Sequence, residues 1–267
     1  LLLDDHRTGA EVVVVVVGGR AKGWARGTRL GPAVREDHGD GIAIVNLKRI
    51  PSLSSTTIAD GRAQIGALVT AAELARSVDV ASSVPLLAAA AASMGSRQLR
   101  ALATVGGNIC SGDPASDLTV ALLASDAMCV LAANNHGERR LPLRDVLIPG
   151  GTICAPGELV VAVEVPITHA QVAYRKIMTR HAFEMAIVAV AVSLSRDGDR
   201  LSALRIAIAG AAPTCLRAAH AEKLAASMQP QGDGRDWAEH IAEAAAAHDA
   251  LPEDDERASA DYHRQLV

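Results

Sequence analysis

Residues 104–117 constrain the fold of this chain most strongly, because two adjacent glycines are followed closely by two carboxylates. The stretch reads T-V-G-G-N-I-C-S-G-D-P-A-S-D. Glycines such as Gly106 and Gly107 can adopt positive φ, so we expect their amide groups to turn toward an anion. The apolar segment 118–123 predicts a helix, which places Asp113 and Asp117 at or just before a helix N-terminus.

Short polar side chains add hydrogen-bonding groups to the same stretch. Asn108 and Ser111 can donate to a phosphate, while Asp113 and Asp117 can accept from ribityl or ribose hydroxyl groups. An ordinary surface turn uses the same residue types, and the Gly-Gly-Asn triplet alone would favour that interpretation. The complete order of residues instead favours a site for a phosphate and a sugar.

This stretch resembles the A-T-V-G-G-N-x-x-x-x-D-P-A-S-D signature of the FAD-binding subunit of the molybdenum hydroxylases. That family includes xanthine dehydrogenase and aerobic carbon monoxide dehydrogenase. Four further segments resemble family motifs in the same order along the chain. They are V-N-L-K-R-I-P at 45–51, I-G-A-L-V-T at 65–70, A-Y-R-K at 173–176 and I-A-G-A-A-P-T at 208–214. The resemblance therefore spans almost the whole chain.

The resemblance implies an α+β protein with an FAD-binding domain of PCMH type and a smaller α+β C-terminal domain. The FAD-binding domain is expected over residues 1–170, as two α/β subdomains of about 1–52 and 53–170. The C-terminal domain is expected over residues 171–267. A chain of 267 residues is long enough to form two such domains.

Local patterns predict individual elements within this frame. The β-branched run 12–17 and the apolar run 42–47 predict strands, with residues 23–41 as a mobile connection. Asp60-Gly61 predicts a hairpin turn, and Thr70 predicts the cap of a helix. Further helices are expected at 84–92, 216–228 and 237–248, and further strands at 127–132, 159–165, 187–194 and 204–208.

The first phosphate loop of the family has the form A-G-G-T-D, and Val17, Gly18, Gly19, Arg20 and Ala21 occupy that position here. The glycines match the family, whereas the following Thr and Asp are replaced. Arg20 could supply a charge-assisted bond to the pyrophosphate in place of the missing hydroxyl. A turn that ends a strand is an equally weighted alternative for the two glycines.

The resemblance also assigns FAD contacts in the central signature and beyond it. Met94 and Gly95 stand where the family places an apolar residue against the isoalloxazine, and Val160 matches a residue at the flavin face; ordinary core packing is the alternative for both. Lys176 matches a lysine near the pyrimidine edge, with a surface lysine as the alternative. The signature residues assigned to FAD are Thr104, Gly106, Gly107, Asn108, Ser111, Asp113, Ser116 and Asp117.

Composition excludes several other functions. The net charge of −4 and the scattered basic residues give no footprint for nucleic acid. The four cysteines lack metal-ligand spacing, and His136, His169 and His181 are expected to be exposed to solvent. No catalytic residue stands out, no apolar run is long enough to span a bilayer, and no signal-peptide pattern is seen, so we expect a cytoplasmic protein.

The resemblance implies a function in electron transfer. The chain would carry FAD, accept electrons from the [2Fe-2S] clusters of a small subunit and pass them to an external acceptor. A large subunit would hold the molybdopterin cofactor, and a dimer of heterotrimers is one arrangement of the complex. Two alternatives stay open: an assembly subunit that has lost FAD, which the altered loop at Arg20 and Ala21 would suit, and a self-sufficient flavin oxidase. The substrate oxidised at molybdenum is not visible in this chain.

Overall fold

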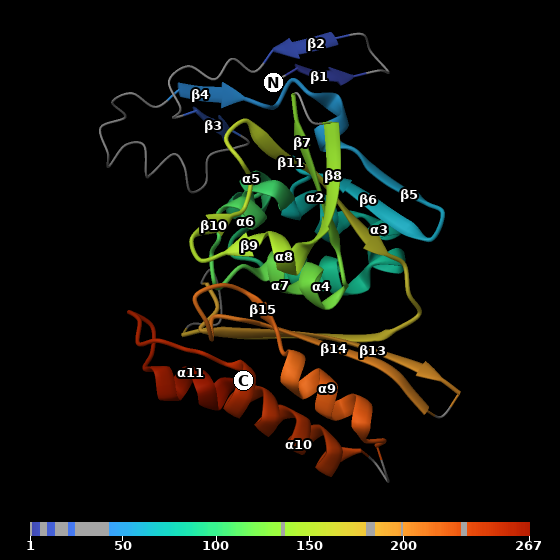
Figure 1. Ribbon diagram of the computed structural model, residues 1–267, viewed down its shortest axis with the longest axis vertical. Coiled ribbons are helices and arrows are strands. Elements are labelled where there is room, and N and C mark those ends of the chain that lie inside the picture. The colour runs from blue at the N-terminus through green and yellow to red at the C-terminus, as the bar shows by residue number, and fades with distance from the viewer. Residues whose placement is uncertain are drawn as a thin grey trace.

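The computed structural model describes residues 2–5, 10–13, 21–24, 43–134, 137–179, 185–198, 200–230 and 234–267, with only the backbone given before residue 45. The chain is arranged in three layers (Figure 1). Small strands from the N-terminal part lie at one end, a five-stranded sheet with its helices forms the middle, and a four-stranded sheet with the C-terminal helices forms the other end. The α+β class expected from the sequence is therefore confirmed.

The N-terminal part contributes two small sheets. Strand β1 (Leu2–Asp5) pairs antiparallel with β2 (Ala10–Val13), and β3 (Ala21–Trp24) pairs parallel with β4 (Ala43–Asn46). The strand expected at 42–47 is thus confirmed. Placing 23–41 entirely in a connection was wrong at its start, because Gly23 and Trp24 belong to β3. Of the strand expected at 12–17, residues 14–17 lie outside the described residues.

The central sheet has the order β5-β6-β11-β7-β8 and is antiparallel throughout. The predicted turn at Asp60-Gly61 joins its first two strands, and both residues adopt positive φ. This conformation suits a tight hairpin between twisted strands. The strands are β5 (Thr56–Ala59), β6 (Arg62–Gly66), β7 (Met128–Ala133), β8 (Gly137–Pro142) and β11 (Glu158–Pro166).

Short helices cover one face of this sheet. Thr70 and Glu73 form a reciprocal capping box at the start of the first of them, as its Thr and Glu spacing predicts. The other face packs on Leu47, Ile50 and Leu53 from the N-terminal part. The helices are α2 (Ala71–Arg76), α3 (Val78–Ser83), α4 (Pro85–Ser93), α5 (Arg97–Leu102), α6 (Val105–Cys110), α7 (Asp117–Ala124) and α8 (Leu143–Val146). Three short elements complete this region: the 3-10 turn η1 (Pro51–Ser54), β9 (Leu147–Ile148) and β10 (Gly151–Thr152).

The C-terminal sheet has the order β12-β13-β14-β15, and its middle strands β13 and β14 pack against other elements on both faces. Small side chains such as Ala189 and Ala207 face α7, whereas larger ones such as Ile206 and Ile208 face the C-terminal helices. The predicted helix at 216–228 begins later than expected, because Leu216–Arg217 forms an edge strand. The elements are β12 (Gln171–Ile177), β13 (Val188–Asp197), β14 (Arg200–Ala209), β15 (Leu216–Arg217), α9 (Ala219–Ser227), α10 (Arg235–Ala244), the π-helical turn η2 (Ala245–Asp249) and α11 (Ala260–Leu266).

Helix α7 is the element around which the two larger sheets meet. Every one of its residues is buried, and it contacts both β13 and β14. A helix that is apolar on all sides is stable only in such an interior position. Its N-terminal residue, Asp117, is therefore held where the central layer and the C-terminal sheet meet. No helix in the described parts of the chain is long and apolar enough to cross a bilayer.

Candidate functional site

The glycine pair lies at the start of a helix and not in an open loop. Thr104 caps α6, and its Oγ1 atom accepts a hydrogen bond from the Gly107 amide at 3.1 Å. Neither Gly106 nor Gly107 adopts positive φ. The positive φ that these glycines could adopt is therefore not used, and their amides do not turn outward in the way expected. At Gly106 the absence of a Cβ atom allows close packing instead.

The amide groups of the pair are already bonded inside the protein. The Gly106 amide donates to the carbonyl of Ala67 at 2.8 Å, and the Gly107 amide donates to Oγ1 of Thr104 as described above. A Cβ atom at Gly106 would lie only 2.8 Å from the Cβ of Ala67, so this glycine is required by packing. Gly107 is exposed and presents bare backbone to the surface. A ligand can approach closely there, but the two glycine amides are not its free donors.

The polar side chains after the glycines bind one another. The Ser116 hydroxyl donates to Oδ1 of Asn108 at 3.0 Å, and the Ser111 hydroxyl donates to the carbonyl of Asn108 at 2.9 Å. Asp113 accepts a hydrogen bond from the Ala115 amide through Oδ1. The stretch therefore folds as one compact turn that leads from α6 into α7.

Asp117 ends this turn and pairs with two side chains of β12. The Lys176 ammonium lies 2.9 Å from its carboxylate, and the Tyr174 hydroxyl donates to the same carboxylate. The side chains of Lys176 and Asp117 are only 4% and 7% exposed. Lys176 is therefore not a surface lysine. We call Thr104, Asn108, Ser111, Ser116, Asp117 and Lys176 the signature network.

Tyr174 stays neutral in this environment. Burial raises the pKa of its hydroxyl far above the ordinary value, and the nearby Asp117 carboxylate raises that pKa further. A neutral phenol can donate one hydrogen bond to Asp117 while Lys176 supplies the compensating charge. The carboxylate is consequently oriented from two sides.

Residues of the C-terminal part of the chain also form hydrogen bonds to the backbone of the Asp113–Asp117 segment. The Gly210 amide donates to the carbonyl of Pro114 at 2.7 Å, and the Cys215 thiol donates to the same carbonyl at 3.3 Å. Gly210 has φ of +81°, and a Cβ there would lie 2.0 Å from the carbonyl oxygen of Ile187. Only glycine permits this approach. Burial raises the pKa of the Cys215 thiol to about 12, which keeps it a donor.

The other predicted FAD residues are less closely joined to the network. Val160 is buried in β11, which contacts α6. Gly95 has φ of +36°, and its carbonyl accepts a hydrogen bond from Arg100 at 2.9 Å. Met94 packs against the core. Residues 17–20 of the first loop lie outside the described residues, and for Ala21 only the backbone at the start of β3 is described.

The donor and acceptor groups that remain suit a ligand with phosphates and hydroxyls. Thr104 accepts a hydrogen bond through Oγ1 and donates to no residue that the structure describes. The Lys176 ammonium has three N–H donors, and among the residues that the structure describes its partner is Asp117. A buried cation and the exposed backbone of Gly107 are groups that suit an anionic, polyhydroxylated cofactor such as FAD.

Metal binding has no support within the described ranges, where no cluster of His, Cys, Asp and Glu could hold an ion. His169 is exposed, as expected. His136 and His181 lie outside the described residues. Sequence reasoning assigned no role to Tyr174, Gly210 or Cys215. Two of them stand in the motif segments 173–176 and 208–214, but only the fold brings all three against residues 113–117.

Each half of the chain matches the sequence model of a known protein family. The sequence model for the FAD binding domain in molybdopterin dehydrogenase matches residues 11–168. The model for the CO dehydrogenase flavoprotein C-terminal domain matches residues 173–267. The two matches together cover nearly the entire chain.

Individual relatives agree with these family matches. The chain is 34% identical to the 6-hydroxypseudooxynicotine dehydrogenase complex subunit alpha of Paenarthrobacter nicotinovorans, over 68% of this chain and 62% of that protein. It is 31% identical to the xanthine dehydrogenase FAD-binding subunit of Escherichia coli O157:H7, over 84% and 77%. A solved structure of carbon monoxide dehydrogenase from Hydrogenophaga pseudoflava, which lacks the Mo-pyranopterin moiety, superposes with a TM-score of 0.86 at 30% identity, covering 93% of this chain and 86% of that one.

Proposed function

The chain belongs to the FAD-binding family of the molybdopterin dehydrogenases, and we propose that it is the FAD-carrying electron-transfer subunit of a multi-subunit, molybdenum-containing oxidoreductase. The observation that carries the proposal is the signature network, in which one set of polar contacts joins Thr104, Asn108, Ser111 and Ser116, and the next residue, Asp117, pairs with Lys176. It lies in the segments that the family matches cover. A bound phosphate and sugar chain would use the types of group found there.

The structure suggests how the chain's own residues serve FAD. The Thr104 hydroxyl and the bare backbone at Gly107 suit the phosphates, and the Lys176 ammonium suits a site where negative charge develops. Asp117, which also accepts a hydrogen bond from Tyr174, pairs with Lys176 and holds it in place. The complete set proposed to contact FAD is Val17, Gly18, Gly19, Arg20, Ala21, Gly95, Thr104, Gly106, Gly107, Asn108, Ser111, Asp113, Ser116, Asp117, Val160 and Lys176.

When bound, FAD supplies the ability to take up electrons singly and release them in pairs. The chain supplies orientation, charge and a dry setting for that chemistry. Lys176 carries a positive charge that is nearly excluded from water, so it acts on a nearby charge more strongly than a surface lysine would. Asp117 limits the cost of keeping that charge buried.

The partners follow from what the chain lacks. No metal cluster was found within the ranges that the structure describes, and all four cysteines are unpaired thiols. The molybdopterin cofactor then belongs to a large subunit, and the [2Fe-2S] clusters belong to a small subunit. A heterotrimer, or a dimer of heterotrimers, in the cytoplasm is the proposed form. The change of family match between residues 168 and 173 supports a domain boundary near residue 170.

Flavin content of the purified chain tests the proposal. A flavin absorption spectrum with close to one FAD per chain is expected, together with co-purification of an iron–sulfur subunit and a molybdenum subunit after expression from neighbouring genes. A well-folded chain that takes up no FAD would overturn the proposal in favour of an assembly subunit. Turnover of an organic substrate by the isolated chain with FAD would favour a self-sufficient oxidase.

A further inference from the structure

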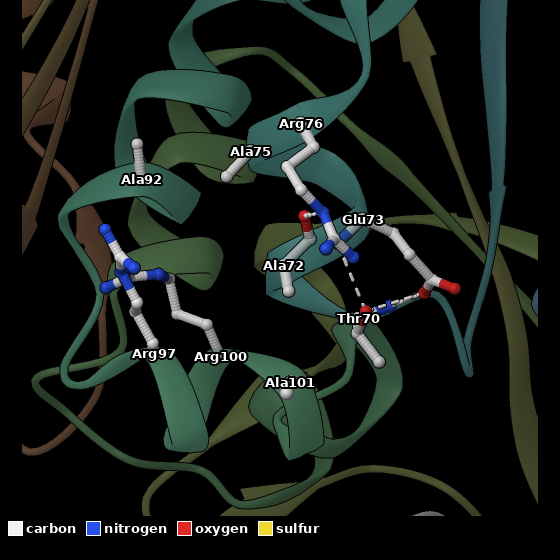
Figure 2. A pocket seen from close by; sticks show the side chains of 9 residues that line it. All are labelled: Thr70, Ala72, Glu73, Ala75, Arg76, Ala92, Arg97, Arg100 and Ala101. Atoms are coloured by element: carbon white, nitrogen blue, oxygen red, sulfur yellow. Dashed lines mark hydrogen bonds between the residues drawn. The ribbon is translucent and has the colours of Figure 1, made fainter.

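A cavity of about 600 Å³ lies between α2, α4 and α5 (Figure 2). Its volume is in the range of pockets that hold small molecules. Four alanines keep the space open, because their side chains are too short to fill it. None of its lining residues belongs to the set proposed to contact FAD. The lining residues are Thr70, Ala72, Glu73, Ala75, Arg76, Ala92, Arg97, Arg100 and Ala101.

Three arginines give this cavity its charge. Figure 2 shows Arg97 and Arg100 side by side on α5, with Arg76 facing the space from α2. Arg97 is exposed and makes no hydrogen bond or ion pair with any residue that the structure describes. Two like charges one helical turn apart repel each other. An anion between them would remove that repulsion.

Backbone carbonyls hold the other two arginines in position. Nη1 of Arg100 donates to the carbonyls of Met94 at 2.6 Å and of Gly95 at 2.9 Å. Nε of Arg76 donates to the carbonyl of Ala72 at 3.0 Å. Each guanidinium keeps further N–H groups for a ligand, since it has five donors in all. A guanidinium fixed in this way loses little freedom when it binds.

Glu73, which also lines the cavity, does not neutralise the arginines. Its Oε2 atom accepts hydrogen bonds from the amide and the hydroxyl of Thr70 at 2.7 Å and 2.6 Å. These contacts form the capping box of α2. No ion pair from Glu73 to an arginine is found within the described ranges. The lining therefore keeps a net positive charge.

We infer that this cavity binds a small molecule with an oxyanion group, either a carboxylate or a phosphate. Arginine forks match both groups and form paired, charge-assisted hydrogen bonds with them. The alanine walls leave room for an apolar body beside the anion. The cavity is separate from the proposed FAD site. The two sites are connected through the backbone, because the Ala71 amide donates to the carbonyl of Ala103 at 2.9 Å and Ala103 directly precedes Thr104.

The test uses the full-length chain saturated with FAD, titrated by calorimetry at constant ionic strength. The probes are inorganic phosphate, AMP and benzoate. Saturable binding of at least one probe at one site per chain is expected, and Arg97→Ala should weaken it by roughly tenfold or more, as for loss of a charged hydrogen bond. Arg97→Glu should abolish it. Arg200→Ala removes an exposed arginine on β14 and should leave binding unchanged.

The three probes identify the ligand class. Binding of phosphate or AMP alone assigns a phosphate ligand, and binding of benzoate alone assigns a carboxylate ligand. Three results would overturn the inference: no saturable binding of any probe, equal binding by the wild type and Arg97→Glu, or, on chain prepared without FAD, displacement of the bound probe when FAD is added. Because thermal stabilisation by the probes can also be measured on chain without FAD, this test stands even if the proposed flavin function fails.

Discussion

The Nζ atom of Lys176 lies 2.9 Å from the carboxylate of Asp117, although 59 residues separate the two along the chain. The pair joins β12 of the C-terminal domain to the first residue of α7. Both side chains are nearly excluded from water, so each charge depends on the other. This contact is at once a structural tie between domains and part of the proposed FAD site.

Removing one member of the pair should destabilise the protein. Asp117→Ala leaves Lys176 buried without its counter-charge and is expected to cost about 3–5 kcal/mol of unfolding free energy. Urea denaturation of the apo chain measures the loss. The exposed Asp145 offers a matched control, since Asp145→Ala should change little. The same Asp117→Ala variant should also retain less FAD on dilution, and wild-type stability and flavin content together would contradict both roles.

Thr104 is expected to affect FAD beyond its effect on helix stability. Thr104→Val removes the cap of α6 and also the hydroxyl proposed to contact phosphate. Ser96→Ala removes the equivalent cap of α5 at a residue outside the proposed site. Each change should lower stability by about 1 kcal/mol, but only Thr104→Val should raise the FAD dissociation constant. Equal FAD affinity in both variants would remove Thr104 from the site.

Cys215 makes stability depend on pH in the alkaline range. Below pH 9, the ordinary thiol value, Cys215 is protonated in both states. Between pH 9 and about 12 only the unfolded chain loses this proton, because burial raises the folded pKa to about 12. The unfolding free energy should therefore fall by about 1.4 kcal/mol per pH unit from this group. Cys215→Ala, compared with wild type at pH 8 and pH 10.5, should show a shallower decline; parallel declines would exclude this contribution.

Arg20 gives a prediction about the first loop that rests on sequence alone. If its guanidinium replaces the missing threonine at the pyrophosphate, Arg20→Ala should weaken FAD binding more at low salt than at high salt, because ions screen a partly exposed charge pair. Arg20→Thr should recover much of the loss through a neutral hydrogen bond. Dissociation constants at two ionic strengths measure the effect, and identical values for all three proteins would mean that Arg20 is not a ligand.

The elements that could be predicted are those whose signals are local. The turn at Asp60-Gly61 needs only two residues in the left-handed region, and the cap at Thr70 needs only Glu73 three positions later. Helix α3 was missed because its six residues, V-D-V-A-S-S, carry no periodic apolar face. Strand β3 was missed because its parallel partner, β4, follows only after a long interval of sequence.

The site was predictable in its residues but less so in its geometry. Motif order identified Lys176 and Asp117 separately, yet nothing in either motif indicates that the two side chains bind each other. The glycine pair illustrates the opposite error. Its residue type suggested open backbone around an anion, whereas tight packing of Gly106 on Ala67 explains the same choice. Long-range contacts decide such cases, and they are set by the assembled fold.

The close approach of Gly210 to Ile187 and Pro114 has a consequence for protein engineering. The flavin-binding half of the chain contains the Asp113–Asp117 segment, but the shape of that segment is maintained by β12 and by the connection between β14 and β15 from the other half. In a chimera that joins this N-terminal half to the C-terminal half of a distant relative, the residues that contact the Asp113–Asp117 segment would therefore no longer match it. Recombination between family members should succeed only when the Asp113–Asp117 segment and the C-terminal residues that contact it come from the same parent.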